Sequence, residues 1–167
     1  FIFFAIKGNK SNGEKFIKEA IANGATVIVS SNKFENKNKK ILLLKRINIR
    51  NLVSKVASKF YKLKPKNIIA VTGTNGKTSV ADLFYQILSL NNVPVASIGT
   101  LGIKYKNKII KTSLTSPDTI SIHRHLQNLK KKKIDNVIIE ASSHGLSQDR
   151  LDHVSFKTAI FTNLSQD

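Results

Sequence analysis

The segment TGTNGKT, residues 72–78, has the composition of a loop that binds phosphate. Gly73 and Gly76 can adopt backbone conformations that other residues avoid, so successive amide groups can surround a phosphate. Lys77 would then reach the β- and γ-phosphates of a nucleotide, and the Thr78 hydroxyl would ligate Mg²⁺. The loop is shorter than the common pattern G-x-x-x-x-G-K-[ST], so an ordinary strand-to-helix turn is the alternative interpretation.

A single carboxylate, Glu140, stands near the end of the apolar run NVIIE at residues 136–140. Nucleotide enzymes hold Mg²⁺ with one or two carboxylates together with phosphate oxygens. Glu140 is therefore a candidate metal ligand beside Thr78, provided that its strand lies next to the phosphate loop. A carboxylate that caps a nearby helix is the alternative.

The elements that must position these residues alternate between strand and helix patterns. We expect strands at 1–6, 25–30, 41–44, 68–72, 93–98, 136–141 and 158–162, helices at 14–24, 47–61, 77–91 and 118–133, and a hairpin at 101–113. This alternation predicts an α/β fold with a mostly parallel sheet covered on both faces. Ligands of such sheets bind at the carboxyl ends of the strands.

The charged segment KLKPKN, residues 62–67, is interrupted by a proline and is typical of a linker. We therefore predict two partial domains. A small α/β domain would occupy residues 1–64, and a P-loop-type ATPase domain with a mostly parallel sheet would occupy residues 65–167.

The composition restricts the classes of partner. The formal net charge is +18, but lysine supplies nearly all of the basic residues, and arginine occurs only at positions 46, 50, 124 and 150. Proteins that recognise nucleic-acid sequences favour arginine for bidentate base contacts. We therefore interpret the charge as a solvated basic surface and expect no nucleic-acid partner. The chain has no cysteine, which excludes disulfides and thiolate metal sites. Its apolar runs are too short to cross a membrane.

The loop VTGTNGKT, residues 71–78, resembles the nucleotide loop of the Mur ligases. These ATP-dependent enzymes add amino acids to the peptide of bacterial cell-wall precursors. The loop also resembles that of folylpolyglutamate synthetases, but those usually read Gly-Lys-Gly-Ser, whereas this chain reads Gly-Lys-Thr-Ser. The resemblance implies ATP contacts at Gly73, Thr74, Asn75, Gly76, Lys77, Thr78 and Ser79.

The segment EASSHGLSQDR, residues 140–150, is similar to the branch of the Mur ligases that adds the third peptide residue. The resemblance implies that Ser142, Gln148 and Arg150 contact the substrate UDP-N-acetylmuramoyl-L-Ala-D-Glu. A guanidinium at Arg150 suits this assignment, because it can pair with acidic groups of the substrate.

Two hydroxyl residues, Thr115 and Ser116, stand where this branch has two threonines that bind the same substrate. The resemblance implies that both keep this role. From the residues alone, Ser116 could instead cap the following helix, with Pro117 as its first residue. His123 and His125 are two positions apart, which places them on different faces of a helix and argues against a metal pair.

The resemblance implies a ligase that uses ATP and Mg²⁺. The γ-phosphate would activate a substrate carboxylate as an acyl phosphate, and the amino group of an amino acid would then attack it to form an amide. Lys77 is the catalytic residue that we expect, and meso-diaminopimelate and L-lysine are both open as the amino acid. A folylpolyglutamate synthetase-like ligase and a basic nucleic-acid-binding module are the alternatives.

Residues 1–64 are similar to the latter part of the UDP-binding domain of the Mur ligases. The chain has no methionine and begins with the core-like run FIFFAI. We therefore expect a part of a longer protein that forms no amide by itself. We also expect a cytoplasmic monomer without membrane contact.

Overall fold

The computed structural model describes residues 1–8, 11–32, 38–112 and 114–165, which form two compact units. The first unit comprises residues 1–53 and the second comprises residues 54–167. The division falls within the helix α2 (Ile49–Phe60), so the first residues of this helix belong to unit 1 and the rest to unit 2.

Unit 1 contains a parallel three-stranded sheet in the order β1-β2-β3. Its elements are β1 (Ile2–Phe4), the short 3-10 helix η1 (Gly13–Phe16), α1 (Ile17–Ala22), β2 (Val27–Ser30), β3 (Leu42–Lys45) and the start of α2. Ile28 packs against α1, whereas the next residue, Val29, packs against Ile49 and Val53 of α2. The alternation of side chains along β2 thus buries both faces of this small sheet.

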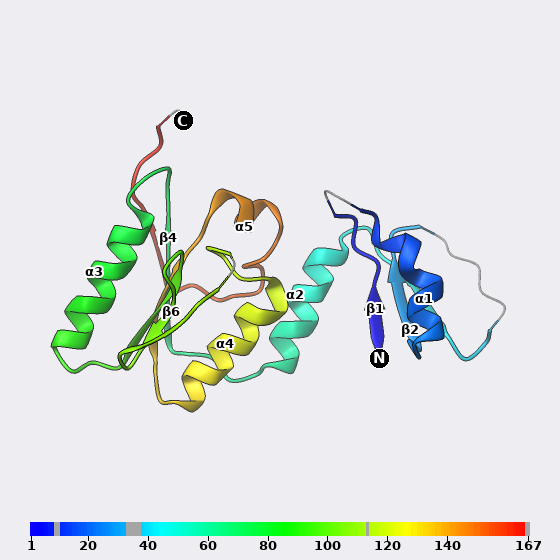
Figure 1. Cartoon of the computed structure of the whole chain (residues 1–167), viewed down its shortest axis with the longest axis horizontal. Helices are drawn as coiled ribbons and strands as arrows, with labels where there is room; N and C mark the ends of the chain where they lie inside the picture. Colours follow the sequence, from blue (N-terminus) through cyan, green and yellow to red (C-terminus); the bar gives the residue numbers. More distant parts are fainter. Residues whose placement is uncertain (9–10, 33–37, 113, 166–167) are drawn as a thin grey trace. The chain divides into compact units, whose positions relative to one another are not determined.

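Unit 2 contains a mixed six-stranded sheet in the order β7-β6-β5-β8-β4-β9. Figure 1 labels two of its strands, β4 and β6. Its elements are β4 (Asn67–Thr72), α3 (Lys77–Leu90), β5 (Val95–Gly99), β6 (Gly102–Tyr105), β7 (Lys108–Ile110), α4 (Thr119–Lys131), β8 (Asn136–Glu140), α5 (Ser143–Ser147) and β9 (Thr158–Phe161). Strands β4, β5, β8 and β9 are parallel, and β6 and β7 form an antiparallel hairpin.

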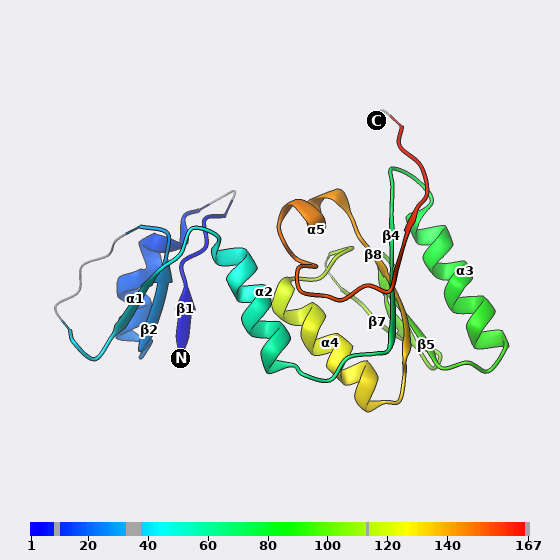
Figure 2. The same cartoon turned by 180° about the vertical axis from the view of Figure 1, so that it is seen from behind.

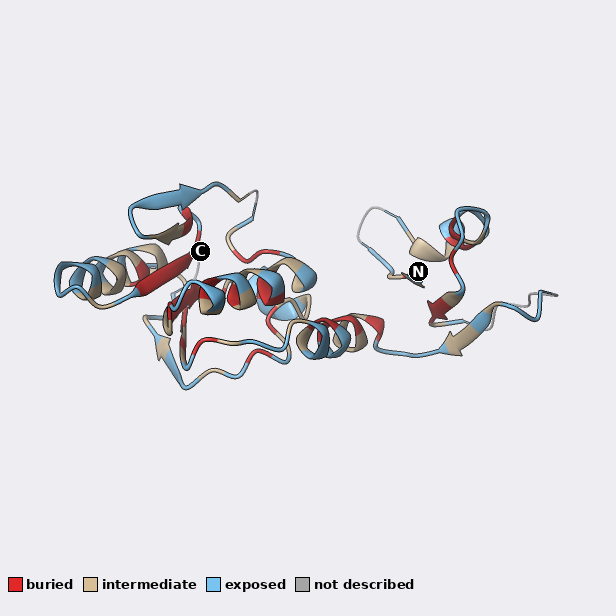
Figure 3. Ribbon diagram, turned by 90° about the horizontal axis from the view of Figure 1, so that it is seen from below, coloured by how far each residue is buried: buried red, intermediate tan, exposed pale blue. Residues whose placement is uncertain are grey.

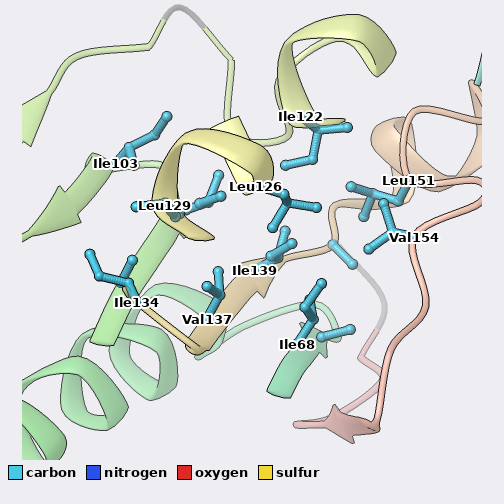
Figure 4. Close-up of a cluster of buried hydrophobic side chains, with 14 residues drawn as sticks. Ile68, Ile103, Ile122, Leu126, Leu129, Ile134, Val137, Ile139, Leu151 and Val154 are labelled. Carbon is cyan, nitrogen blue, oxygen red and sulfur yellow. The ribbon is translucent and has the colours of Figure 1, made fainter. Parts of the chain in front are cut away.

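Helices cover both faces of this sheet, with α3 on one side and α4 on the other (Figure 2). Val137 and Ile139 of β8 pack in the same cluster as Leu126 of α4 (Figure 4), whereas Ile138 packs with Ala81 of α3. The central strands are therefore buried on both faces. Figure 3 colours each residue of the ribbon by its burial. This double burial fixes the register of the strands and brings the carboxyl ends of β4, β5 and β8 to one edge.

The predicted fold class is confirmed, and every predicted strand and helix is present with shifted ends. The predicted helix 14–24 begins as the 3-10 turn η1, and the predicted hairpin 101–113 is formed by β6 and β7, although residue 113 lies outside the described residues. No helix in the described ranges combines the length and apolarity needed to cross a bilayer.

The start of α4 differs from the alternative interpretation in which Ser116 caps this helix. The cap is Asp118, whose carboxylate accepts hydrogen bonds from the amides of Ile120 (3.0 Å) and Ser121 (2.9 Å). A carboxylate at this position also interacts favourably with the helix dipole. Ser116 is thereby left for another role. The short helix α5 was not predicted, because its five residues offer no helical periodicity.

A buried set of polar contacts connects α4 to the middle of α2 and to the linker. His123 of α4 is fully buried, its Nδ1 lies 2.9 Å from Nζ of Lys64, and its Nε2 lies 3.2 Å from Oγ of Ser54. The Ser54 hydroxyl donates in turn to the carbonyl of Asp152. Burial, together with the positive charge of Lys64, lowers the pKa of His123 to about 4, and burial lowers the pKa of Lys64 to about 8.

These contacts of His123 predict a specific loss of stability in acid. The unfolded chain takes up a proton at this histidine near its ordinary pKa of 6.5, whereas the folded chain does so only near 4. The contribution is therefore complete above pH 6.5 and is lost as the pH falls toward 4, by about 1–3 kcal/mol. In denaturant unfolding, the free energy of unfolding of His123→Gln should decrease less between pH 6.5 and pH 4 than that of the unsubstituted chain.

The exposed histidine His144 provides the matched control, since His144→Gln should retain the pH dependence of the unsubstituted chain. An unchanged pH dependence in His123→Gln would contradict this interpretation of the buried contacts.

Candidate functional site

The candidate site lies in unit 2, where the carboxyl ends of three parallel strands meet. Val71 of β4 is in register with Glu140 of β8, and Ile98 of β5 is in register with Ile139 of β8. The residues that follow these strands are consequently neighbours, although up to about seventy positions separate them in the sequence. The register thus brings the phosphate loop, the end of β5 and Glu140 together.

The loop has the backbone conformation that its glycines predicted. Gly73 has φ +133° and Gly76 has φ +84°, a region that side chains disfavour. A Cβ atom on Gly73 would also lie 2.8 Å from the carbonyl oxygen of Asn163, which follows β9. Glycine is therefore required at position 73 by both the backbone angle and the space.

Residues after β9 hold the first half of the loop through hydrogen bonds. The amides of Thr74 and Asn75 donate to the backbone and side-chain oxygens of Asn163, each at 3.0 Å, and the Thr162 hydroxyl donates to the Asn75 carbonyl at 2.6 Å. The second half of the loop starts α3, whose first amides have no acceptor within the helix. Such amides, at the positive end of a fourteen-residue helix, form a site for an anion.

Lys77 lies across this loop. Its ammonium group is 2.5 Å from the carbonyl oxygen of Gly73 and 2.7 Å from that of Thr74. The side chain is half-buried and belongs to the first residue of α3. Phosphate oxygens placed there could replace these carbonyls as acceptors. Ser79, the last predicted contact, is exposed in the first turn of α3.

Glu140 is buried, with 2% of its surface exposed. Its Oε2 accepts hydrogen bonds from the hydroxyls of Thr78 (2.9 Å) and Thr100 (3.0 Å), and its Oε1 accepts one from the Thr100 amide (3.0 Å). Burying a carboxylate is unfavourable unless donors such as these satisfy its oxygens. Because Thr78 is among them, the two residues predicted to hold a metal are in direct contact.

The donor set at Glu140 fits Mg²⁺. One carboxylate and adjacent hydroxyls are oxygen ligands, and Mg²⁺ in nucleotide sites takes few protein ligands together with phosphates and water. Across the described residues, no group of three or more His, Cys, Asp or Glu side chains could hold a metal by itself. A metal at Glu140 and Thr78 would therefore depend on the bound nucleotide for its remaining ligands.

Gly99 and Thr100, at the end of β5, were missed by the sequence analysis. A Cβ atom on Gly99 would lie 2.6 Å from Cγ of Glu140, so only glycine leaves space for this side chain. The signal that could have found them is the Gly-Thr pair at the end of a predicted strand, which falls at the ligand-binding edge of the sheet.

Ser116 joins the end of β8 to α5. Its hydroxyl is fully buried and donates to the carbonyl of Glu140 at 2.9 Å, and it accepts from the Ser142 amide at 3.2 Å. Ser142 caps α5 by accepting from the Gly145 amide at 3.1 Å. Both serines thus have a structural role here, and their contact with a substrate stays a prediction.

Gln148 and Arg150 are hydrogen-bonded to each other, and Arg150 is also hydrogen-bonded to Ser116. The guanidinium donates through Nε (3.2 Å) and Nη2 (2.7 Å) to Oε1 of Gln148, and through Nη1 (2.8 Å) to the carbonyl of Ser116. Thr115 lies on the other side of Ser116, with its Oγ1 3.2 Å from Oγ1 of Thr100. A connected set of polar contacts therefore runs from the phosphate loop through Glu140 and Thr100 to the predicted substrate residues.

This arrangement places two cationic groups, Lys77 and Arg150, near opposite ends of a polar network whose centre is the buried carboxylate of Glu140. It can hold a nucleotide phosphate at one end and an acidic ligand at the other. His144 lies exposed on α5 and makes no contribution to this network through its ring among the described contacts.

Comparison with known proteins gives matches along almost the whole chain. Residues 71–167 match the Mur ligase middle domain, and residues 1–61 match the group described as Mur ligase family, catalytic domain. UDP-N-acetylmuramoyl-L-alanyl-D-glutamate–2,6-diaminopimelate ligases from Bradyrhizobium diazoefficiens and Rickettsia montanensis are each 40% identical over 99% of this chain, which covers 34% and 35% of their lengths.

A solved structure of a ligase with the same name superimposes with a TM-score of 0.82 at 31% identity, covering 99% of this chain and 34% of the other. The MurF ligase from Thermotoga maritima, solved with ADP, has the same fold at 21% identity with a TM-score of 0.61, covering 97% of this chain and 34% of that one. The chain spans about a third of the length of the curated relatives that it matches.

The space at Gly99 yields a direct test of the site geometry. Gly99→Ala should lower the free energy of unfolding by about 1–3 kcal/mol, because the added Cβ collides with the Glu140 side chain. In a Glu140→Ala background the colliding atoms are absent, and the same substitution should cost much less. Denaturant unfolding of the four variants measures this difference, and an equal cost in both backgrounds would show that the collision is not the cause.

Proposed function

Because the chain belongs to the Mur ligase family, we propose that it acts in the ATP-dependent ligase of this family that adds an amino acid to UDP-N-acetylmuramoyl-L-alanyl-D-glutamate, the MurE type. The observation that carries the proposal is the polar network of unit 2, which links a phosphate loop to the Ser142, Gln148 and Arg150 cluster. The names of the 40% identical relatives support the same substrate. Those names also favour 2,6-diaminopimelate over L-lysine as the amino acid.

The proposed reaction has two steps. An oxygen of the substrate carboxylate attacks the γ-phosphorus of ATP, and ADP leaves. The amine of the amino acid then attacks the acyl carbon, phosphate leaves, and the amine loses a proton as the amide forms. Neither step needs a side-chain nucleophile.

The contribution of this chain is binding and electrostatic stabilisation. The α3 amides and Lys77 face the phosphates and compensate the charge that develops on the transferred phosphoryl group. Arg150 holds an acidic group of the UDP-linked substrate in a fixed geometry, because Gln148 and the Ser116 carbonyl orient its guanidinium. Thr78 and Glu140 would hold Mg²⁺, which supplies additional positive charge to the phosphates when bound.

The remaining assignments rest on the family resemblance. Residues 1–64 are proposed as part of the UDP-substrate-binding domain and residues 65–167 as part of the ATP-binding domain, a boundary that differs from the division of the compact units after Val53. The cytoplasmic location and the monomeric state stay predictions. No contact in the described residues specifically favours a folate or a nucleic acid.

Lys77 provides the first test of the proposed function. In the protein that the natural gene encodes, Lys77→Met should reduce ATP-dependent amide formation by about 10²-fold or more, because a positive charge beside the transferred phosphoryl group is lost. Lys108→Met, at an exposed lysine of β7, is the matched control and should retain full turnover. Near-normal turnover by Lys77→Met would refute the assignment of the loop.

Arg150 tests the second half of the site. Arg150→Ala should weaken binding of the UDP-muramoyl dipeptide by about tenfold or more, since charge-assisted hydrogen bonds are lost, and it should change ATP affinity much less. Arg124→Ala, at an exposed arginine of α4, is the control. Separate calorimetric titrations of the two ligands measure the effect, and equal losses for both ligands would count against the assignment.

A further inference from the structure

Thr100 contacts both halves of the candidate site. We propose that Thr100 is a positioning residue that fixes the Glu140 carboxylate for the cation and couples the nucleotide site to Thr115. This inference rests on the proposed function. It concerns a residue that lies outside the phosphate loop and outside the segments that resemble the substrate-binding motifs of the family.

The first observation is that Thr100 contacts both oxygens of one carboxylate. Its amide donates to Oε1 and its hydroxyl donates to Oε2 of Glu140, each at 3.0 Å. Two donors on one residue fix the plane of the carboxylate, which rotation about the last side-chain bond would otherwise leave free. The Thr78 hydroxyl, 2.9 Å from the same Oε2, then lies at a defined place relative to that plane.

The second observation is that the Thr100 hydroxyl has two acceptors within reach but only one proton. Glu140 Oε2 lies 3.0 Å away and Thr115 Oγ1 lies 3.2 Å away. A hydroxyl donates one hydrogen bond, so donation to the carboxylate competes with donation to Thr115. A cation beside the carboxylate repels the hydroxyl proton and favours its donation to Thr115. Occupation of the nucleotide site thereby changes the hydrogen bonding of a predicted substrate residue.

The packing around Thr100 supports this role over that of an ordinary strand end. Gly99 leaves the space that the Glu140 side chain fills, so the carboxylate reaches the Thr100 amide without displacing β5. Thr115 precedes Ser116, which is fully buried and bonds to the Glu140 carbonyl at 2.9 Å. Backbone and side chain of Glu140 are thus both connected to the segment that carries Thr115.

The experiment compares Thr100→Val, which keeps the shape but removes the hydroxyl, with Thr100→Ser, which keeps the hydroxyl. Thr158→Val, at an exposed threonine of β9, is the matched control. In the protein that the natural gene encodes, binding of a non-hydrolysable ATP analogue is titrated by calorimetry at a series of Mg²⁺ concentrations and in the presence of a chelator. Binding of the UDP-muramoyl dipeptide is then measured with and without the Mg²⁺ analogue complex.

We expect Thr100→Val to raise the Mg²⁺ concentration for half-maximal analogue binding by about tenfold, because the carboxylate is no longer oriented by two donors before the cation binds and the hydrogen bond to Thr115 in the bound state is lost. Analogue affinity in the chelator should stay within about twofold, because the loop contacts are intact. The effect of the Mg²⁺ analogue on dipeptide affinity should also disappear. Thr100→Ser and Thr158→Val should behave as the unsubstituted protein.

Unchanged Mg²⁺ dependence and unchanged coupling in Thr100→Val would overturn the inference and leave the proposed function standing. Absence of Mg²⁺-dependent analogue binding in the unsubstituted protein would instead overturn the proposed function and the inference with it. Thermal unfolding of each variant confirms folding, and Thr100→Ala, which removes the same hydroxyl, gives the same test if Thr100→Val does not fold.

Discussion

The burial of the Glu140 carboxylate at the end of β8 is the constraint on which the rest of unit 2 depends. A charge with 2% exposure would be strongly unfavourable without donors, and the fold supplies them from two different segments. Thr78 comes from the start of α3 and Thr100 from the end of β5, so both elements must lie beside β8 in one register. Gly99 is required for the same reason, because any larger residue would occupy the space of the carboxylate. The buried carboxylate of Glu140 is therefore satisfied only when the central parallel strands lie in this order and register.

The phosphate loop depends on a second support, which comes from the far end of the sequence. Asn163 and Thr162 follow β9 and satisfy the first amides and the carbonyl of Asn75, which leaves the α3 amides for a ligand. The predicted substrate residues depend on Ser116, since its hydroxyl donates to the Glu140 carbonyl and its own carbonyl accepts from Arg150. The residues proposed to bind the nucleotide and the substrate thus belong to one hydrogen-bonded framework. In the proposed ligase, this framework would align the γ-phosphate with the substrate carboxylate before reaction.

The sequence predicted those features that depend on local chemistry. The run IIAV before TGTNGKT determines a buried strand and a loop, and the glycine conformations followed from the loop itself. Features that depend on distant partners could not be predicted in this way. The burial of His123 requires Ser54 and Lys64 from another segment, and the true cap of α4 was decided by competition between Ser116 and Asp118. Thr100 was missed although it follows a predicted strand, because only the register of β5 with β8 reveals that its partner is Glu140.

The central claim is that one polar network receives both ligands, with Glu140 between them. A crystal structure of the protein encoded by the natural gene, with a non-hydrolysable ATP analogue, Mg²⁺ and the UDP-muramoyl dipeptide, tests it most directly. The account predicts the γ-phosphate at the α3 amides and Lys77, the cation in contact with Thr78 and Glu140, and an acidic group of the dipeptide at Arg150. A nucleotide bound elsewhere, or a dipeptide without contact to the segment from Ser142 to Arg150, would contradict it.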